Sequence, residues 1–153
     1  MSTVTEQEKL LRDYYRRATI LVQNDDYKGL ADLLEGVATS DWTATDANGE
    51  SHPIVQQLQL LRSDTVLHPA NVGQYAYTVK KISFHGDTAY VDAVQKKTTI
   101  EVDTEGKYGT KGKKHRITSL EPTRDTWVKL LGKWKLRNSR SFRMLVEVDG
   151  KAR

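Results

Sequence analysis

The stretch from Arg124 to Arg140 constrains the fold of this chain more than any other part of it. Two runs of alternating apolar and polar residues, each containing a tryptophan, flank the dipeptide Leu131-Gly132. Alternation with a period of two is typical of half-buried strands, and a two-residue connection between such runs is typical of a β-hairpin. We therefore expect two antiparallel strands closed by a tight turn, in a sheet that includes further strands.

A two-residue turn also fixes which residues of this hairpin lie opposite one another. In the simplest register Asp125 lies opposite Asn138, and Thr123 lies opposite Arg140. One face of the hairpin then carries Asp125, Trp127, Trp134, Leu136, Asn138 and Arg140. We expect the aromatic part of this face to pack on a helix. Its polar end would form either a paired network or a ligand site, because buried polar groups need partners.

The chain before position 74 has mainly helical periodicity. This helical pattern is interrupted at Gly36, at Pro53 and at a turn over 46–49. The expected elements are a helix over 5–23, a helix over 27–35 ended by Gly36, a strand over 37–45, a helix from 51 to about 64, and a connection over 65–73.

From position 74 onward the period changes to two, which predicts strands. The expected strands cover 74–85, 88–102, 113–130 and 133–148, with a long mobile hairpin loop over 103–112. Pro122 falls inside the third of these strands. Because proline has no backbone N–H to donate, we expect a bulge or an edge position there.

Helices followed by long antiparallel strands are typical of the α+β class. We expect a single domain over 1–153, in which a cone-shaped, curved antiparallel sheet wraps around the long N-terminal helix and two further helices complete the cone. A chain of 153 residues is long enough to bury one core. It has no cysteine, which excludes disulfides and thiolate metal sites.

The charges are divided unequally, with a net −5 over residues 1–70 and a net +9 over 71–153. A basic half can indicate a nucleic-acid surface, but lysine-rich outer strands explain it more simply. The same alternatives apply to the basic residues around Tyr108 at 107–116, where a solvated loop is the plainer interpretation. No apolar run approaches the ~18 residues of a membrane span. We expect a cytoplasmic protein with neither a membrane nor a nucleic-acid partner.

No motif in the sequence predicts a metal or a cofactor. The four histidines, at positions 52, 68, 85 and 115, are scattered, and there is no phosphate-binding or nucleophile-elbow pattern. Asp41 and Asp46 flank the end of the first predicted strand, where solvated turn residues are the simpler interpretation. We therefore expect no metal site and no cofactor.

Three stretches together resemble the nuclear transport factor 2-like superfamily, especially its SnoaL-like and uncharacterised small members. They are the helix break at 24–30, the predicted hairpin at 82–91 and the tryptophan hairpin at 125–136. The resemblance implies a cystatin-like α+β roll with a cone-shaped pocket. The superfamily includes isomerases, dehydratases and cyclases as well as transport factors and oligomerisation domains, so the fold does not decide the function.

Within such a cone we expect the ligand pocket to include Tyr14, Tyr15, Trp42, Asp125, Trp127, Asn138 and Arg140. Asp125 is the candidate catalytic residue, as a general base, if its surroundings raise its pKa. A structural Asp–Arg pair that closes the end of a strand is the alternative. We expect the chain to bind a small hydrophobic or aromatic ligand, with a SnoaL-like isomerase, dehydratase or cyclase activity as the catalytic form of this hypothesis. The alternative is a non-catalytic homodimeric binding or assembly module.

Both faces of the predicted sheet carry apolar residues. By alternation, one face carries Tyr75, Tyr77, Val79, Tyr90 and Val94, and the opposite face carries Ile82, Phe84, Ala89 and Val91. One face would cover the helices, and the other would expose an aromatic patch in a monomer. We therefore expect a homodimer formed through the sheet, an arrangement that the resemblance also implies.

Overall fold

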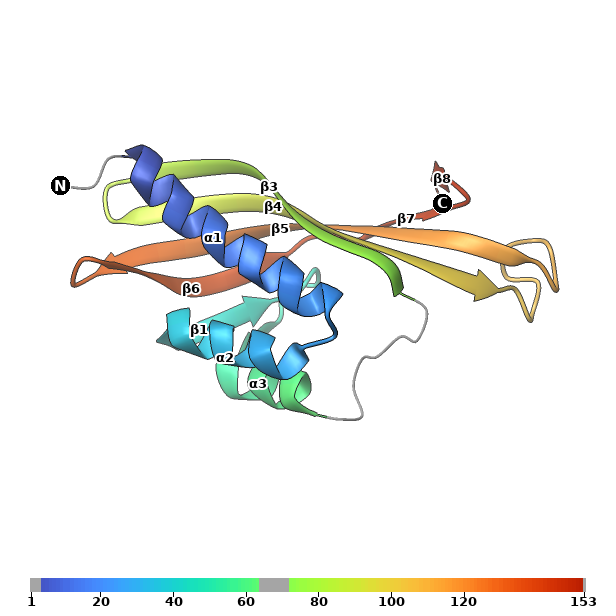
Figure 1. The fold of residues 1–153 in the computed structure, drawn as a ribbon, viewed down its shortest axis with the longest axis horizontal. Helices are drawn as coiled ribbons and strands as arrows, with labels where there is room; N and C mark the ends of the chain where they lie inside the picture. Colours follow the sequence, from blue (N-terminus) through green and yellow to red (C-terminus); the bar gives the residue numbers. More distant parts are fainter. Residues whose placement is uncertain (1–3, 64–71, 153) are drawn as a thin grey trace.

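A long first helix lies across a strongly curved sheet in the computed structural model of this chain, which describes residues 4–63 and 72–152 (Figure 1). The helices are α1 (Val4–Gln23), α2 (Tyr27–Val37) and α3 (Ile54–Arg62). Most of the predicted connection over 65–73, including His68, lies outside the described residues. Among the described helices, none has a stretch that is long and apolar enough to cross a membrane.

The helices form where the apolar residues recur at helical spacing. On α1 the buried positions Leu11, Tyr15 and Ala18 form one stripe that faces the sheet. Asp26 caps α2, because its carboxylate accepts a hydrogen bond from the Gly29 N–H at 2.8 Å. The predicted stop at Gly36 is wrong, since α2 continues to Val37.

Within residues 4–63 and 72–152 the strands form one eight-stranded sheet with the order β2-β1-β6-β5-β4-β3, and β7 and β8 lie off this path. Their bounds are β1 (Ala38–Thr45), β2 (Ser51–Pro53), β3 (Val72–His85), β4 (Thr88–Val102), β5 (Lys114–Leu130), β6 (Lys133–Ser141), β7 (Leu145–Val148) and β8 (Lys151–Ala152). The predicted α+β class is confirmed. One detail is wrong, because β1 pairs with β6 in parallel and the sheet is therefore mixed.

The predicted tight turn joins β5 to β6. Leu131 has φ 51° and Gly132 has φ 78°, the pair of positive values that a two-residue type I′ turn requires. Leu130 pairs with Lys133, and Trp127 pairs with Leu136, as the sequence predicts. The hairpin therefore begins in the expected register.

Beyond Trp127 the register shifts by one residue, and the predicted pairing of Asp125 with Asn138 is wrong. Asp125 pairs with Ser139 instead, and Arg140 pairs with Arg124. Arg137 is the extra residue of a β-bulge, which bends a strand and reverses the parity of the residues that follow. β6 also pairs with β1, and that pairing is irregular over the same level, between Ala38 and Thr43.

A second bulge lies in β3 between Val79 and Lys81, and it reverses the side of the sheet to which alternate residues point beyond it. Because of it, Tyr75, Tyr77 and Val79 lie on the same side of the sheet as Ile82 and Phe84. Tyr75 is buried, and the other four pack against the hydrophobic core. The predicted exposed aromatic face is therefore wrong, and of its five residues only Tyr90 and Val94 lie on the outer side.

The predicted strand over 133–148 is in fact two strands, β6 and β7. Pro122 lies at the point where β5 stops pairing with β6 and begins to pair with β7. The final pair with β6 is Thr123–Ser141, and the first pair with β7 is Leu120–Leu145. The pairing of β5 with β4 runs through Pro122 without a shift. Pro122 therefore occupies an edge-like position, where its missing N–H breaks no ladder, and the bulge lies elsewhere.

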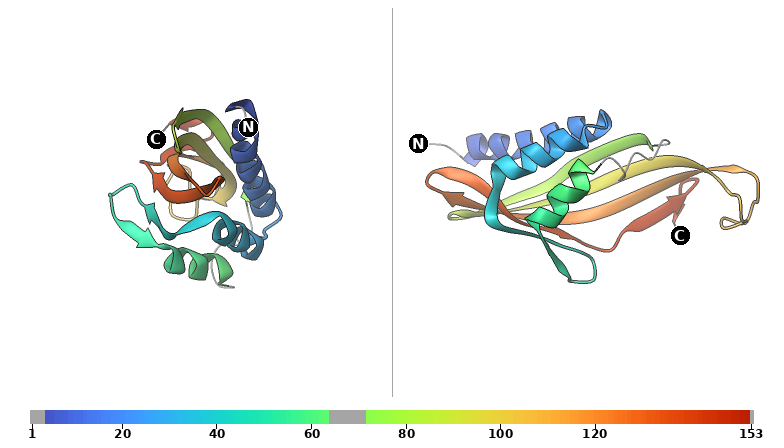
Figure 2. Two further views of the ribbon diagram at one scale, coloured as in Figure 1. Left: turned by 90° about the vertical axis from the view of Figure 1, so that its left-hand side faces the viewer. Right: turned by 90° about the horizontal axis from the view of Figure 1, so that it is seen from below.

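The sheet curls so that its concave inner face carries the core and its helices. Viewed from one end, α1 lies along one side of the curl, and α2 with α3 lies below it (Figure 2). The largest fully buried side chains include Trp127 of β5, Tyr15 and Leu11 of α1, and Leu136 of β6. This core supports one wall of a cavity between the helices and the inner face.

Candidate functional site

A cavity of about 340 Å³ lies between the three helices and the inner face of the sheet. Its helix side, completed by β1, is mainly apolar and aromatic. The lining residues there are Tyr14, Ala18, Val22, Leu30, Leu34, Trp42, Ala44, Gln57 and Leu61. A cavity of this size holds a small organic molecule.

The strand side of the cavity is polar. It is formed by Tyr75, Tyr77, Gln95, Glu121, Thr123, Asp125, Ser139, Arg140 and Ser141. Glu121, Thr123 and Asp125 alternate along β5, which places their side chains in one row on the inner face. The Tyr75 hydroxyl donates to Gln95 at 2.9 Å, and the Ser141 hydroxyl donates to Glu121 at 2.7 Å. The cavity therefore has an apolar wall facing a hydrogen-bonding wall.

Asp125 lies in this polar wall with 2% of its surface exposed. The Tyr15 hydroxyl donates to Asp125 Oδ2 at 2.5 Å, and Trp127 Nε1 donates to the Tyr15 hydroxyl at 3.0 Å. Tyr77 makes a longer contact of 3.5 Å with Oδ2. Asp125 Oδ1 is buried and accepts no hydrogen bond of ordinary length from the described residues, although the hydroxyl of Ser139, its pair on β6, lies near enough to lower the pKa of Asp125. A buried acceptor without a partner is uncommon and requires an explanation.

The surroundings of Asp125 change its protonation. Burial raises its pKa from 3.8 to about 6, although the hydroxyls of Tyr15, Ser139 and Tyr77 act in the opposite direction. Burial, and then the charge of Asp125, also raise the pKa of Tyr14. A carboxyl group with a pKa near 6 exchanges protons readily close to neutral pH.

The structure brings some of the predicted site residues together and separates others. Tyr14, Trp42 and Asp125 line the cavity. Tyr15 and Trp127 do not line it but lie behind the wall, where they hold Asp125 in position.

Asn138 and Arg140 are displaced by the bulge at Arg137. Asn138 donates to the Thr43 carbonyl oxygen at 3.0 Å, and so it ties β6 to β1. Arg140 contacts the cavity, but it pairs with Arg124 of the outer face, and its guanidinium lies 5.4 Å from the centre of the Phe142 ring. Of the three residues of the predicted polar end, Asp125 and Arg140 therefore line the cavity and Asn138 does not, and no ion pair joins Asp125 to Arg140 among the described residues.

The sequence prediction missed several cavity residues. Glu121 and Thr123 have the same parity as Asp125 on one strand, so the alternation of β5 alone could have identified them. Tyr77 could not be found in this way, because the bulge in β3 reverses its predicted side. Ser139 was hidden by the bulge in β6 for the same reason.

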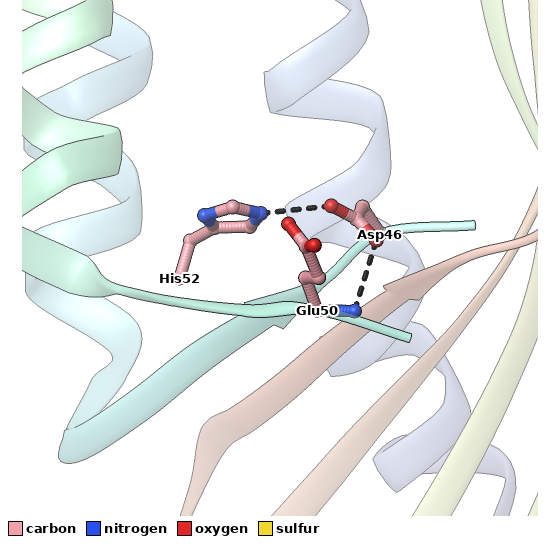
Figure 3. Close-up of side chains that lie close together, drawn as sticks. All are labelled: Asp46, Glu50 and His52. Carbon is pink, nitrogen blue, oxygen red and sulfur yellow. Dashed lines mark hydrogen bonds and ion pairs between the residues drawn. The ribbon is translucent and has the colours of Figure 1, made fainter. Parts of the chain in front are cut away.

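Asp46, Glu50 and His52 form a second group of polar side chains, in the β1–β2 hairpin (Figure 3). Each offers one potential metal ligand, and these atoms lie within 4.8 Å of one another. Asp46 accepts hydrogen bonds from the N–H groups of Asn48 and Glu50, and it contacts His52 Nε2 at 2.9 Å. These bonds close the turn and explain the cluster without a metal. The bond to Asp46 raises the pKa of His52.

The basic loop between β4 and β5 is ordered around Asp103, which is 2% exposed. Its carboxylate accepts from the N–H groups of Tyr108 and Thr110. Lys135 pairs with Val128 near the end of β5 and donates to the Gly36 carbonyl, whereas the basic loop precedes Lys114 at the start of β5, so Lys135 does not extend this basic surface. These hydrogen bonds give the loop a defined conformation around Asp103, and its predicted mobility stays a prediction.

The chain resembles several solved structures across almost its whole length. An NTF2-like protein of unknown function from Shewanella baltica OS155 has 13% identity over 94% of this chain and 98% of its own, with a TM-score of 0.60. Another, from Shewanella oneidensis MR-1, has 12% identity over 87% and 96%, with a TM-score of 0.61. A putative Ca/calmodulin-dependent kinase II association domain from Exiguobacterium sibiricum 255-15 has 14% identity over 93% and 95%, with a TM-score of 0.51.

The sequence itself matches no family model and no curated protein. The structural matches confirm the predicted NTF2-like fold. At identities this low they establish the fold and leave the function to be argued from the cavity.

Proposed function

We propose that this chain, which has the NTF2-like fold, binds a small, largely apolar or aromatic molecule in the cavity beneath α1. The observation that carries the proposal is a cavity of about 340 Å³ whose polar wall contains one deeply buried carboxyl group with an unpartnered oxygen. Apolar cavities with a few polar groups at one side are typical of ligand sites.

The alternative function, a non-catalytic module with a filled cone, requires the aromatic side chains to close the cavity. Tyr14 and Trp42 instead leave space between them and the strands. Trp127 packs behind the wall, with its ring 5.1 Å from that of Tyr14. This arrangement favours a ligand-binding function.

The catalytic form of the proposal is an isomerase, dehydratase or cyclase of the SnoaL-like kind. All three reactions move a proton to or from carbon or oxygen, and a carboxyl group with a pKa of about 6 suits that step. Asp125 would exchange the proton through Oδ1, since Oδ2 is held by Tyr15. Tyr14 would contact the ligand beside it.

A thermal-shift screen with steroid, polyketide-like and aromatic acid compounds tests the proposal. A ligand at 100 times its dissociation constant stabilises the folded chain by about 2.7 kcal/mol, which raises the Tm by roughly 5 to 10 °C. In Ala44→Leu, whose added carbons enter the cavity, the shift should fall while the Tm without ligand changes little. If no compound shifts the Tm, or if the shift survives Ala44→Leu, the proposed site is wrong.

A further inference from the structure

We infer that the cavity is selective for amine-bearing ligands and that Asp125 binds their ammonium group. This inference rests on the proposed function, because it names the chemical class that the same cavity accepts. The proposed ligand is apolar or aromatic. The inference adds that its apolar body carries a positively charged group at one end.

The charges of the cavity wall are the first support. Two carboxylates, Asp125 and Glu121, lie in the inward row of β5. The single basic residue among the described lining residues is Arg140, whose guanidinium lies over Phe142 on the outer side of the sheet. Among the described residues no cation is paired with Asp125. A cationic ligand would supply the missing charge.

The unpartnered oxygen is the second support. Asp125 Oδ1 is fully buried and lacks a donor at ordinary hydrogen-bond distance among the described residues, with the Ser139 hydroxyl as its neighbour on β6, whereas Oδ2 is held by Tyr15. A buried carboxylate is stable when a cation and hydrogen bonds satisfy its oxygens together. An ammonium group has three donors and no acceptor, so it would satisfy this oxygen, whereas the buried Nε1 of Trp42, which also lacks a partner among the described residues, needs an acceptor on the ligand.

The aromatic wall is the third support. Tyr14, Trp42, Tyr75 and Tyr77 line the same cavity. Faces of aromatic rings attract cations, and aromatic side chains combined with carboxylates recognise organic ammonium groups. A carboxylate ligand would instead meet Asp125 and Glu121, and like charges disfavour binding.

The position of the ammonium is set by the strand geometry. Glu121 and Asp125 are four residues apart on β5, which separates their backbones by about 13 Å. One ammonium group cannot contact both. Glu121 already accepts a hydrogen bond from Ser141 at 2.7 Å, whereas Asp125 Oδ1 has no donor. The ammonium therefore belongs at Asp125, with the apolar body of the ligand extending along the helices.

Three probes of one shape test the inference by calorimetric titration: 2-(1-naphthyl)ethylamine, 2-(1-naphthyl)ethanol and 1-naphthylacetic acid. We expect the amine to bind about 10- to 100-fold more tightly than the alcohol, which is the range for a charge-assisted hydrogen bond. The acid should bind least. If the alcohol or the acid binds as tightly as the amine, the inference is overturned, while the proposed ligand-binding function stands.

Asp125→Asn should remove the preference for the amine, so that the variant binds the amine and the alcohol with affinities within about threefold of each other. A cooperative urea transition shows that the variant is folded. Asp41→Asn is the matched control, because Asp41 is exposed on β1 and does not line the cavity. It should keep the full preference. Retention of the preference by Asp125→Asn would overturn the inference.

The wild-type protein gives an independent measurement. The titratable groups that line the cavity with Asp125 are Tyr14 from α1, Tyr75 and Tyr77 from β3, Glu121 from its own strand and Arg140 from β6, whose guanidinium lies over Phe142. Tyr15 of α1 contacts Asp125 from behind the wall. The described lining residues of α2, α3, β1 and β4 include no titratable group. The dissociation constant of the amine should rise about tenfold between pH 7.5 and pH 5, because Asp125 becomes protonated near pH 6. The alcohol should show no such rise. A pH-independent amine affinity would contradict the assignment of the ammonium to Asp125.

Discussion

At the scale of single residues, the proton of Asp125 couples the site to the stability of the fold. Its pKa is raised by burial from 3.8 to about 6 in the folded chain. Between these two pH values the folded state binds a proton that the unfolded state has released. Stability therefore increases as the pH falls from above 6 towards 4, and the cost of burying the ionised group is fully present above pH 6.

We predict that Asp125→Asn removes this pH dependence. The shift in pKa corresponds to about 3 kcal/mol, so the unfolding free energy of the variant should gain about 3 kcal/mol relative to wild type between pH 4 and pH 8. Urea unfolding of both proteins at several pH values measures the difference, in which the other titrating groups cancel. If the unfolding free energies of wild type and variant changed equally with pH, Asp125 would not be a buried, ionisable group.

Tyr15 holds the buried carboxylate from α1. Its hydroxyl donates to Asp125 at 2.5 Å and accepts from Trp127 Nε1 at 3.0 Å. Tyr15→Phe should lower the unfolding free energy by about 1 to 3 kcal/mol, because it leaves Trp127 Nε1 without a partner among the described residues and leaves Asp125 Oδ2 with only the 3.5 Å contact to Tyr77. It should also raise the pKa of Asp125 above about 6, since the hydrogen bond from Tyr15 lowers that pKa.

The adjacent tyrosine is the control for this prediction. The Tyr14 hydroxyl makes no hydrogen bond to the described residues, and its ring lines the cavity. Tyr14→Phe removes the same atom, yet it should change stability by less than about 0.5 kcal/mol. Equal losses in the two variants would mean that the Tyr15–Asp125 bond contributes nothing.

At the scale of elements, the turn of the tryptophan hairpin contains a residue that does not suit its backbone. Leu131 has φ 51° and is fully exposed. A left-handed conformation is unfavourable for leucine and well tolerated by asparagine, which is preferred at this position of a type I′ turn. Leu131→Asn should therefore stabilise the chain by about 0.5 to 1 kcal/mol in thermal or urea unfolding.

The same substitution at Leu10 tests whether the backbone causes this effect. Leu10 is 63% exposed on α1, where asparagine is a poorer helix former than leucine. Leu10→Asn should destabilise the chain by a few tenths of a kcal/mol. Stabilisation by both variants would point to the removal of exposed leucine, and would contradict the argument from the turn.

The elements themselves follow from the sequence because their periodicity is local. The stripe on α1 and the alternation of β4 and β5 predict which residues face inward, as Tyr15 and Asp125 do. The extra residues at Arg137 and Lys80 carry no such local signal, because a bulge depends on the strands on both sides. These two residues account for the misplacement of Asn138, Arg140 and Tyr77.

At the scale of the whole molecule, the outer face of the sheet is the surface through which the predicted homodimer would form. The helices lie on the inner side in Figures 1 and 2, and no described helix covers the outer face. The aromatic patch that first motivated the dimer is absent, because the bulge in β3 turns three of its residues inward. The register instead brings together four apolar residues on the outer side: Val94, Leu120, Pro122 and Leu145.

We predict that the chain dimerises through this outer face. Leu145, the first residue of β7, is 56% exposed and pairs with Leu120, and a partner that covers it would bury apolar surface. Light scattering at about 10 μM should then give twice the 17.4 kDa of one chain. Leu145→Glu should reduce the mass to that of one chain, because an unpaired charge in an interface is costly.

Leu10→Glu places the same charge on α1, away from this face, and should leave the dimer intact. A wild-type mass of 17.4 kDa, or equal loss of the dimer in both variants, would contradict this interface.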